Sequence, residues 1–224
     1  MKYVFLTLLI LFSSFCYSQT QYLKVNRDEV KRKVLDSSLN TFYPKLLDRF
    51  LADDTTLSIE DYRLLYYGFV FQKAYVAYPN LQQPRIRKEL EDKNYSTCLQ
   101  ICDSILTQIP ISLIGNYYKG LAMYNANNND PSYSNFRNRF KNILNAIVSS
   151  GDGLTCETAF KTIFVSDEYQ VIYKYFQIET FLSQALELPC DRMNIKPSKY
   201  FSSEKMYFDT SETFEYMKKI MKKD

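Results

Sequence analysis

The 224-residue chain contains no histidine and no tryptophan. Without an imidazole it cannot form a Ser-His-Asp triad, a Cys-His pair or a histidine-ligated zinc site. An enzyme with this sequence would have to use carboxylates, lysine, tyrosine or a thiolate as its reactive groups. The patterns of calcium-binding loops and of phosphate-binding glycine-rich loops are missing as well. We therefore predict no catalytic residue set, no metal site and no cofactor.

An excess of charge of one sign is also missing. The chain carries 28 Lys and Arg residues against 25 Asp and Glu residues, a formal net charge of +3. Its strongest basic run is KKIMKKD at the C-terminus, and such a run is more typical of a solvated tail than of a nucleic-acid or membrane surface. We expect no nucleic-acid partner. The abundant aromatic residues, 20 Tyr and 16 Phe, are most simply explained as core.

Long apolar runs are absent except at the beginning, where MKYVFLTLLILFSSFCYS is typical of an export signal. Lys2 supplies the positive charge, residues 3–12 are apolar, and Cys16 and Ser18 are the small residues before a cleavage site at Gln19. The apolar stretch is too short to cross a bilayer of about 30 Å comfortably. We predict that residues 1–18 are a signal peptide and that the mature protein is periplasmic or secreted, with no membrane span.

Cys16 permits a second interpretation, in which it is a lipid attachment site. The residue before the modified cysteine must be small in a bacterial lipoprotein signal, and here that residue is Phe15. Ordinary cleavage is therefore favoured over lipidation, with an uncleaved anchor as a further alternative.

Four cysteines remain after cleavage, and an even number in an exported chain favours disulfides. Cys98 and Cys102 lie four residues apart in a helical pattern, where two small buried side chains are the simplest reading. Cys156 and Cys190 lie at element boundaries, so a bridge between them is open, and it would stabilise the fold by roughly 3.8 kcal/mol. No CxxC pair is present, which argues against a zinc site.

Helical periodicity dominates the chain up to residue 150. Ser58, with Asp61 three residues later, is a weak capping box at one helix start, and the prolines within 76–84 predict a loop. The three later helices are similar to one and a half tetratricopeptide units, without a strict 34-residue period. We expect helices at residues 26–39, 44–50, 58–75, 95–108, 112–125 and 136–147.

The character of the sequence changes at Ser149–Gly153, which holds two of the five glycines. Beyond it we expect strands at 158–166, 184–195 and 205–209, with helices at 167–177 and 211–221. The predicted fold class is α+β, mostly α. An irregular αα-hairpin, tetratricopeptide-like stack over residues 19–150 precedes a small mixed α/β region over 151–224, and the two pack as one domain.

Three stretches carry a resemblance to a known family. They are FYPKLLDRFLADDTTLSIEDYRLLYYGFVFQKAY, GDGLTCETAFKTIFVSDEYQVI and LPCDRMNIKPSKYFSSEKMYFD, which follow one another in that order. In these stretches the chain resembles the exported bacterial family described as a domain of unknown function, DUF4919. The resemblance implies one domain, helical first and mixed later, and it implies no activity or substrate.

The densest cluster of functional-looking residues lies on the helix expected after Ser58. Its candidate ligand-binding residues are Arg63, Tyr66, Tyr67 and Gln72. A guanidinium flanked by phenols could face a groove and bind a carboxylate or a peptide. Alternatively, the tyrosine rings fill the core between helices while the arginine pairs with a nearby carboxylate. The second interpretation is favoured.

Acidic residues form a weaker candidate cluster around Asp152, Glu157 and the pair Asp167 and Glu168. Paired acids can perform glycosidase chemistry or bind calcium. However, Asp152 fits a turn, and acids after Ser166 fit a helix N-terminus. We expect these acids to be structural. Cys156 is not expected to be a catalytic thiol, because it lacks a histidine partner.

The sequence favours an exported, non-enzymatic module that binds an unknown protein or peptide partner. Stacked helix pairs offer a concave surface that suits extended segments. The alternative is a carboxylate-based hydrolase with a cleft between the helical and α+β parts, which would need converging acids with shifted pKa values. A purely structural envelope component would show neither an aromatic groove nor such acids.

Overall fold

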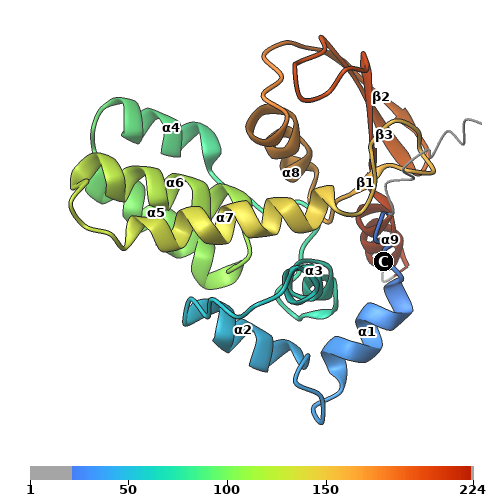
Figure 1. Cartoon of the computed structure of the whole chain (residues 1–224), viewed down its shortest axis with the longest axis horizontal. Coiled ribbons are helices and arrows are strands. Elements are labelled where there is room, and N and C mark those ends of the chain that lie inside the picture. The colour runs from blue at the N-terminus through green and yellow to red at the C-terminus, as the bar shows by residue number, and fades with distance from the viewer. Residues whose placement is uncertain (1–21, 223–224) are drawn as a thin grey trace, which may run out of the picture.

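The computed structural model of the chain describes residues 22–222 (Figure 1), and the expected signal peptide lies outside them. The first part of the described chain is helical, and the segments between its helices are short. The helices are α1 (Arg27–Leu35), α2 (Tyr43–Leu51), α3 (Ile59–Gly68), α4 (Gln83–Glu91), α5 (Tyr95–Gln108), α6 (Leu113–Ala126) and α7 (Tyr133–Val148).

Local sequence signals set the ends of these helices. At the start of α3, Ser58 Oγ accepts from the N–H of Asp61, and the Asp61 carboxylate accepts from the N–H of Ser58. This capping box is the predicted one. Pro44 lies in the first turn of α2, where its missing N–H has no partner to lose. Gly68 lets α3 approach α1, because a Cβ at Gly68 would lie 2.8 Å from Val34 Cγ1.

Two helix predictions need correction. The helix expected over 58–75 ends at Gly68 and continues only as the 3-10 turn η1 (Phe69–Phe71). The loop expected over 76–84 is shorter, because α4 begins at its end with Pro84 in the first turn. The periodic signal of α4 is weak, since Ile86 is its one buried residue.

The second part of the chain builds a sheet in the order β1-β4-β3-β2. β1 pairs with β4 in parallel, whereas β4 pairs with β3 and β3 with β2 in antiparallel fashion. The elements are β1 (Phe160–Lys161), α8 (Val165–Gln170), the π-helical turn η2 (Val171–Tyr175), β2 (Phe181–Glu187), β3 (Cys190–Ile195), β4 (Lys205–Asp209) and α9 (Ser211–Met221).

Two strand predictions are also corrected. The strand expected over 158–166 has only the two residues of β1, because the chain turns into α8 at Val165. The strand expected over 184–195 is a hairpin of β2 and β3 with Leu188 and Pro189 as its turn. Pro189 has no N–H to donate to a ladder, which makes it a turn residue rather than a strand residue.

One hydrophobic cluster joins the two parts of the molecule. The helices α1 to α7, the turns η1 and η2 and the strands β1, β3 and β4 contribute buried side chains to it. α7 contacts β1 and η2, and α6 contacts α8, so the helical stack and the sheet meet through these elements (Figure 1). The fold is α+β and mostly α, with one small mixed sheet. None of the helices between residues 22 and 222 has the length and apolar character that crossing a membrane requires.

Candidate functional site

Arg63, the centre of the site predicted on α3, has a side chain that is only 6% exposed. Its Nε donates to Glu60 Oε2 at 3.2 Å, and its Nη1 donates to Ser149 Oγ at 2.8 Å. Its Nη2 donates to the carbonyl oxygen of Leu23. The Tyr67 ring lies beside the guanidinium, with 5.7 Å between Cζ and the ring centroid. Arg63 and Tyr67 therefore lie together, and the guanidinium is bonded within the chain.

Tyr66 and Gln72, the other predicted residues, do not line the cavity beside Arg63. Tyr66 is fully buried, donates to Asp167 Oδ2 at 2.7 Å and accepts from the N–H of Ile163 at 3.1 Å. Gln72 donates from Nε2 to the carbonyl of Gly68, at the end of α3. The four residues are thus divided between three separate environments.

The cavity beside Arg63 has a volume of about 280 Å³ and is bordered by α1, α3 and residues 22–26, which we call the N-terminal segment. The N–H of Leu23 donates to the carbonyl of Ser149 at 3.1 Å, and the hydroxyl of Tyr22 donates to Asp152 Oδ2 at 2.5 Å. The N-terminal segment thus supplies a backbone carbonyl to Arg63, as a bound peptide would.

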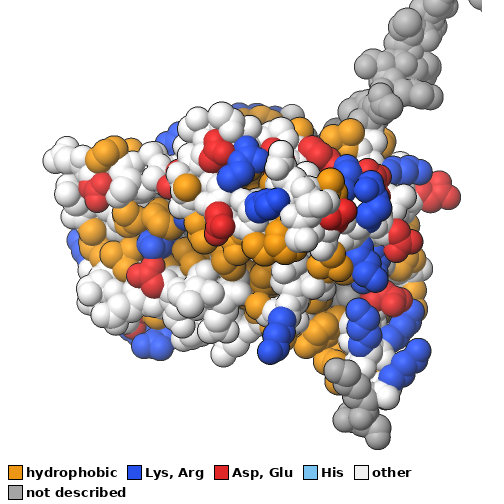
Figure 2. Space-filling model, turned by 90° about the horizontal axis from the view of Figure 1, so that it is seen from below, with side chains coloured by type: hydrophobic (Ala, Val, Ile, Leu, Met, Phe, Trp, Pro, Cys, Tyr) orange, Lys and Arg blue, Asp and Glu red, His pale blue; other side chains and the backbone are white. Residues whose placement is uncertain are grey.

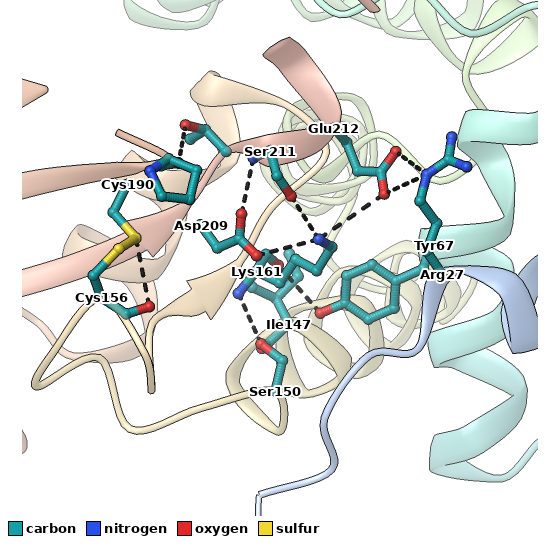
Figure 3. A network of polar contacts seen from close by, with 12 residues as sticks. Arg27, Tyr67, Ile147, Ser150, Cys156, Lys161, Cys190, Asp209, Ser211 and Glu212 are labelled. Atoms are coloured by element: carbon teal, nitrogen blue, oxygen red, sulfur yellow. Dashed lines mark hydrogen bonds and ion pairs between the residues drawn. A yellow bond between two sulfur atoms is a disulfide. The ribbon is translucent and has the colours of Figure 1, made fainter. Parts of the chain in front are cut away.

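A second polar cluster is centred on Lys161 of β1 (Figure 3). Its Nζ donates to Ser211 Oγ at 2.8 Å and to Asp209 Oδ2 at 3.2 Å, and it lies 3.9 Å from Glu212 Oε1. Glu212 also accepts from Nε of Arg27 at 3.1 Å. A Ser-Lys pair can catalyse acyl transfer when the lysine acts as a base. Here two carboxylates surround the ammonium, so the cluster is an ion-pair network that ties α1 and α9 to the sheet.

Cys156 and Cys190 are joined by a disulfide, with their Cα atoms 5.8 Å apart (Figure 3). The bond ties the loop before β1 to the first residue of β3. Cys98 and Cys102 are free and fully buried on α5, and burial raises the pKa of both thiols. A raised pKa keeps a thiol protonated and therefore poorly nucleophilic.

A group of buried carboxyls combines Asp167 and Glu168 of α8 with Asp191 of β3, whose exposed fractions are 2%, 0% and 7%. Burial raises the pKa of Asp167 to about 7, against the opposite effect of the hydrogen bond from Tyr66. Burial also raises the pKa of Glu168 and of Asp191, and the neighbouring Asp191 adds to the rise at Glu168. Neither carboxyl oxygen of Glu168 has a hydrogen-bond partner among the described residues.

The sequence alone predicts only part of this set of three buried carboxyls. Asp167 and Glu168 are adjacent in the sequence, whereas Asp191 lies on β3, and its carboxyl is close enough to that of Glu168 to raise the pKa of Glu168. Within residues 22–222 no set of three or more carboxylates and thiols has the arrangement of a metal site. Neighbouring carboxyls with raised pKa values can share a proton, as acid catalysts do. Their burial leaves a substrate little access in this conformation.

An open groove of about 440 Å³ lies between α6 and α7. The rings of Tyr117 and Phe140 lie 5.2 Å apart between centroids, and those of Tyr124 and Tyr133 lie 5.1 Å apart. Gly120 keeps the two helices close, because a Cβ there would lie 3.3 Å from the carbonyl oxygen of Tyr133. The groove is lined by Tyr117, Gly120, Leu121, Tyr124, Tyr133, Arg137 and Phe140.

Sequence reasoning missed this groove, because Tyr117 and Phe140 follow the helical spacing of core residues. The available signal was the pair of tyrosines, Tyr124 and Tyr133, on either side of the polar turn that joins the two helices. Tyr124 is 45% exposed, which no periodicity argument predicts. Aromatic rings left in solvent at a groove are typical of recognition surfaces.

The model of a family described as "Domain of unknown function (DUF4919)" matches residues 28–219. The match covers all the described helices and strands apart from the first residue of α1 and the last two of α9. No curated protein matches the chain, and no solved structure does.

Proposed function

The chain belongs to the family described as domain of unknown function DUF4919, and because that description names no activity, we propose a function from the geometry alone. The protein is a non-enzymatic interaction module that binds a protein or peptide segment in the groove between α6 and α7. The observation that carries the proposal is the groove itself, which is open, aromatic and bordered by an arginine.

Tyrosine and arginine are the residues that most often dominate binding energy at protein interfaces. Tyr124 and Tyr133 present rigid rings with few rotatable bonds, so little conformational entropy is lost when a partner covers them. The Arg63 face is a poorer candidate, since its guanidinium already contacts Glu60, Ser149 and Leu23.

Two further parts of the proposal concern architecture and location. Helices α4 to α7 form an irregular tetratricopeptide-like stack, in which each helix packs against the next along the chain. Residues 1–18 direct export, and the partner is then a periplasmic or secreted protein. Secretion assays with and without residues 1–18, followed by N-terminal sequencing, test cleavage before Gln19.

A selection from a random peptide library against the mature chain tests the binding function. We expect enriched peptides that lose at least about tenfold in affinity in the double variant Tyr124→Ala, Tyr133→Ala, because the rings supply most of the contact area. The control is Tyr78→Ala, which removes a tyrosine that is 61% exposed and does not line the groove. Failure to enrich any peptide, or equal affinity for the double variant, would contradict the proposal.

The buried carboxyls favour a second candidate function, a carboxylate-based hydrolase acting where the helical and α+β parts meet. Glu168 and Asp191 would share the acid and base roles. Panels of nitrophenyl glycosides and esters would test it, with Glu168→Gln and Asp191→Asn expected to abolish turnover. The exposed Asp48 offers a control, Asp48→Asn. Turnover that survives both carboxyl substitutions would exclude this site.

A further inference from the structure

We propose that the groove between α6 and α7 selects segments in which carboxylate side chains flank an aromatic or aliphatic residue. The inference rests on the proposed binding function and adds the chemistry of the partner. It is carried by the charges of the two helices that form the groove.

Neither helix contains an acidic residue. α6 reads LIGNYYKGLAMYNA and α7 reads YSNFRNRFKNILNAIV, so together they carry four cationic side chains and no Asp or Glu. Two of the cations are already paired, because Lys119 bonds Asp103 and Arg139 bonds Asp53. Arg137 and Lys141 remain, and neither has a side-chain hydrogen bond or ion pair with any described residue.

One of these two cations, Arg137, lies at the groove. Arg137 lines it, and Lys141 follows four residues later on the same face of α7. A third exposed cation, Lys174 of η2, lies over the Tyr117 ring, 4.5 Å from its centroid, and donates to the Tyr117 hydroxyl at 2.9 Å. Arg137 and Lys174 therefore border the aromatic floor, and Lys141 lies next to Arg137 on α7. None of the three has a carboxylate partner among residues 22–222.

Charge complementarity decides the kind of occupant. An apolar or aromatic side chain fits the floor, and carboxylates beside it can form paired hydrogen bonds with the Arg137 guanidinium. Nucleic acid fits less well, because its affinity grows with the number of phosphates neutralised and few free cations are present here. On the face shown in Figure 2, Lys and Arg side chains are interspersed with Asp and Glu side chains and do not form one broad basic patch.

The test uses the full mature chain and three labelled dodecapeptides of otherwise identical sequence. The first carries Asp and Glu around two Phe residues, the second carries Asn and Gln instead, and the third carries Lys. We expect the acidic peptide to bind about tenfold more tightly than the amide peptide at low salt, and this preference to shrink with added salt. The lysine peptide should bind most weakly.

The double variant Arg137→Gln, Lys141→Gln should reduce this preference to below about twofold, with the affinities for the acidic and the amide peptide measured side by side in the same variant. The matched control is Lys31→Gln, Arg32→Gln on α1. It also removes one lysine and one arginine charge from exposed positions, but neither residue lines the groove. The control should retain the full preference. Circular dichroism and thermal melting of each variant verify that the fold is intact.

The outcomes separate the two proposals. If all three peptides bind equally and Tyr124→Ala, Tyr133→Ala weakens them, the groove binds peptides but the inference about acidic partners is wrong. If no peptide binds, or if the tyrosine substitutions change nothing, both proposals are wrong. A polyuronate oligosaccharide is included as a competitor, and groove binding by this glycan alone would overturn the peptide assignment.

Discussion

Two regions of this molecule combine an arginine with tyrosines. In one region these side chains are buried and hydrogen-bonded within the chain, and in the other they are exposed. On α3, Arg63 and Tyr67 are buried, and the guanidinium donates to four oxygens of the same chain. Between α6 and α7, Arg137 and Tyr124 are exposed, and Arg137 has no polar partner among the described residues. The same residue types stabilise the fold on α3 and are accessible to another molecule between α6 and α7.

The difference teaches how to separate a structural cluster from a binding cluster. A buried guanidinium must be fully hydrogen-bonded, because an unpaired buried charge is very costly. An exposed guanidinium is satisfied by water and can exchange that water for a partner. Matched substitutions at buried and at exposed positions therefore test this distinction.

The largest effect concerns Asp167, whose carboxyl contacts the buried Tyr66. Its pKa is about 7 in the folded protein against an ordinary value of 3.8, so between these values the folded state holds more protons than the unfolded state. The contribution of Asp167 to stability is therefore fully present below about pH 4 and is lost as pH rises through about 7, a loss of up to about 4 kcal/mol.

Urea denaturation across pH measures this dependence. Asp167→Asn keeps the shape and can still accept from Tyr66, so it should flatten the profile and be more stable than the wild type above pH 7. Asp48→Asn, at an exposed position of α2, should leave the profile unchanged. Profiles that run parallel in the wild type and in Asp167→Asn between pH 4 and pH 8 would show that Asp167 is not a buried, protonated group.

How far the sequence predicts this fold depends on how local each signal is. The capping box of Ser58 and Asp61, the 14-residue helix α5 and the strand β4 were predicted with the observed bounds or nearly so, because all their information lies within a few neighbouring residues. α4 was missed because Pro84 is compatible with both a loop and a helix start, and only Ile86 marks its buried face.

The candidate sites were harder to predict from the sequence than the helices and strands, because the residues of each site come from different elements. Arg63 pairs with the carboxylate of Glu60, as expected, whereas the carbonyl of Leu23 reaches it through tertiary structure alone. Asp191 joins the acids of α8 only when β3 forms. Tyr124 and Tyr133 meet because two helices pack, and their exposure is a property of the packed molecule rather than of the pattern.

The second prediction compares the two arginines directly. Arg63→Ala removes charge-assisted hydrogen bonds to Ser149 and Leu23 from a buried site and should cost about 2–3 kcal/mol of unfolding free energy. Arg137→Ala should change that free energy by less than about 0.5 kcal/mol, because it has no such bonds. Equal losses of unfolding free energy for the two substitutions in urea denaturation would contradict the distinction between a buried, structural arginine and an exposed one.

The third prediction applies the same test to tyrosine hydroxyls. Tyr66→Phe leaves the N–H of Ile163 and one oxygen of Asp167 without their buried partner, so it should destabilise the fold by about 1–2 kcal/mol. Tyr124→Phe removes a hydroxyl from a ring that is 45% exposed and should be neutral within about 0.3 kcal/mol. Thermal denaturation at one fixed pH compares the two variants, and a neutral Tyr66→Phe would contradict the hydrogen-bonded geometry.

The smallest effect tests whether the N-terminal segment truly acts as the partner of Arg63. A chain that begins at Asn26 loses the Leu23 carbonyl and the bond from Leu23 to Ser149, which should cost about 1 kcal/mol. In the Arg63→Ala background the same truncation should cost distinctly less, since the contact is already gone. A double-mutant cycle in urea measures the difference. Strictly additive losses of unfolding free energy would mean that the N-terminal segment lies near Arg63 without stabilising it. The face of α3 around Arg63 would then be a second candidate binding site for a partner.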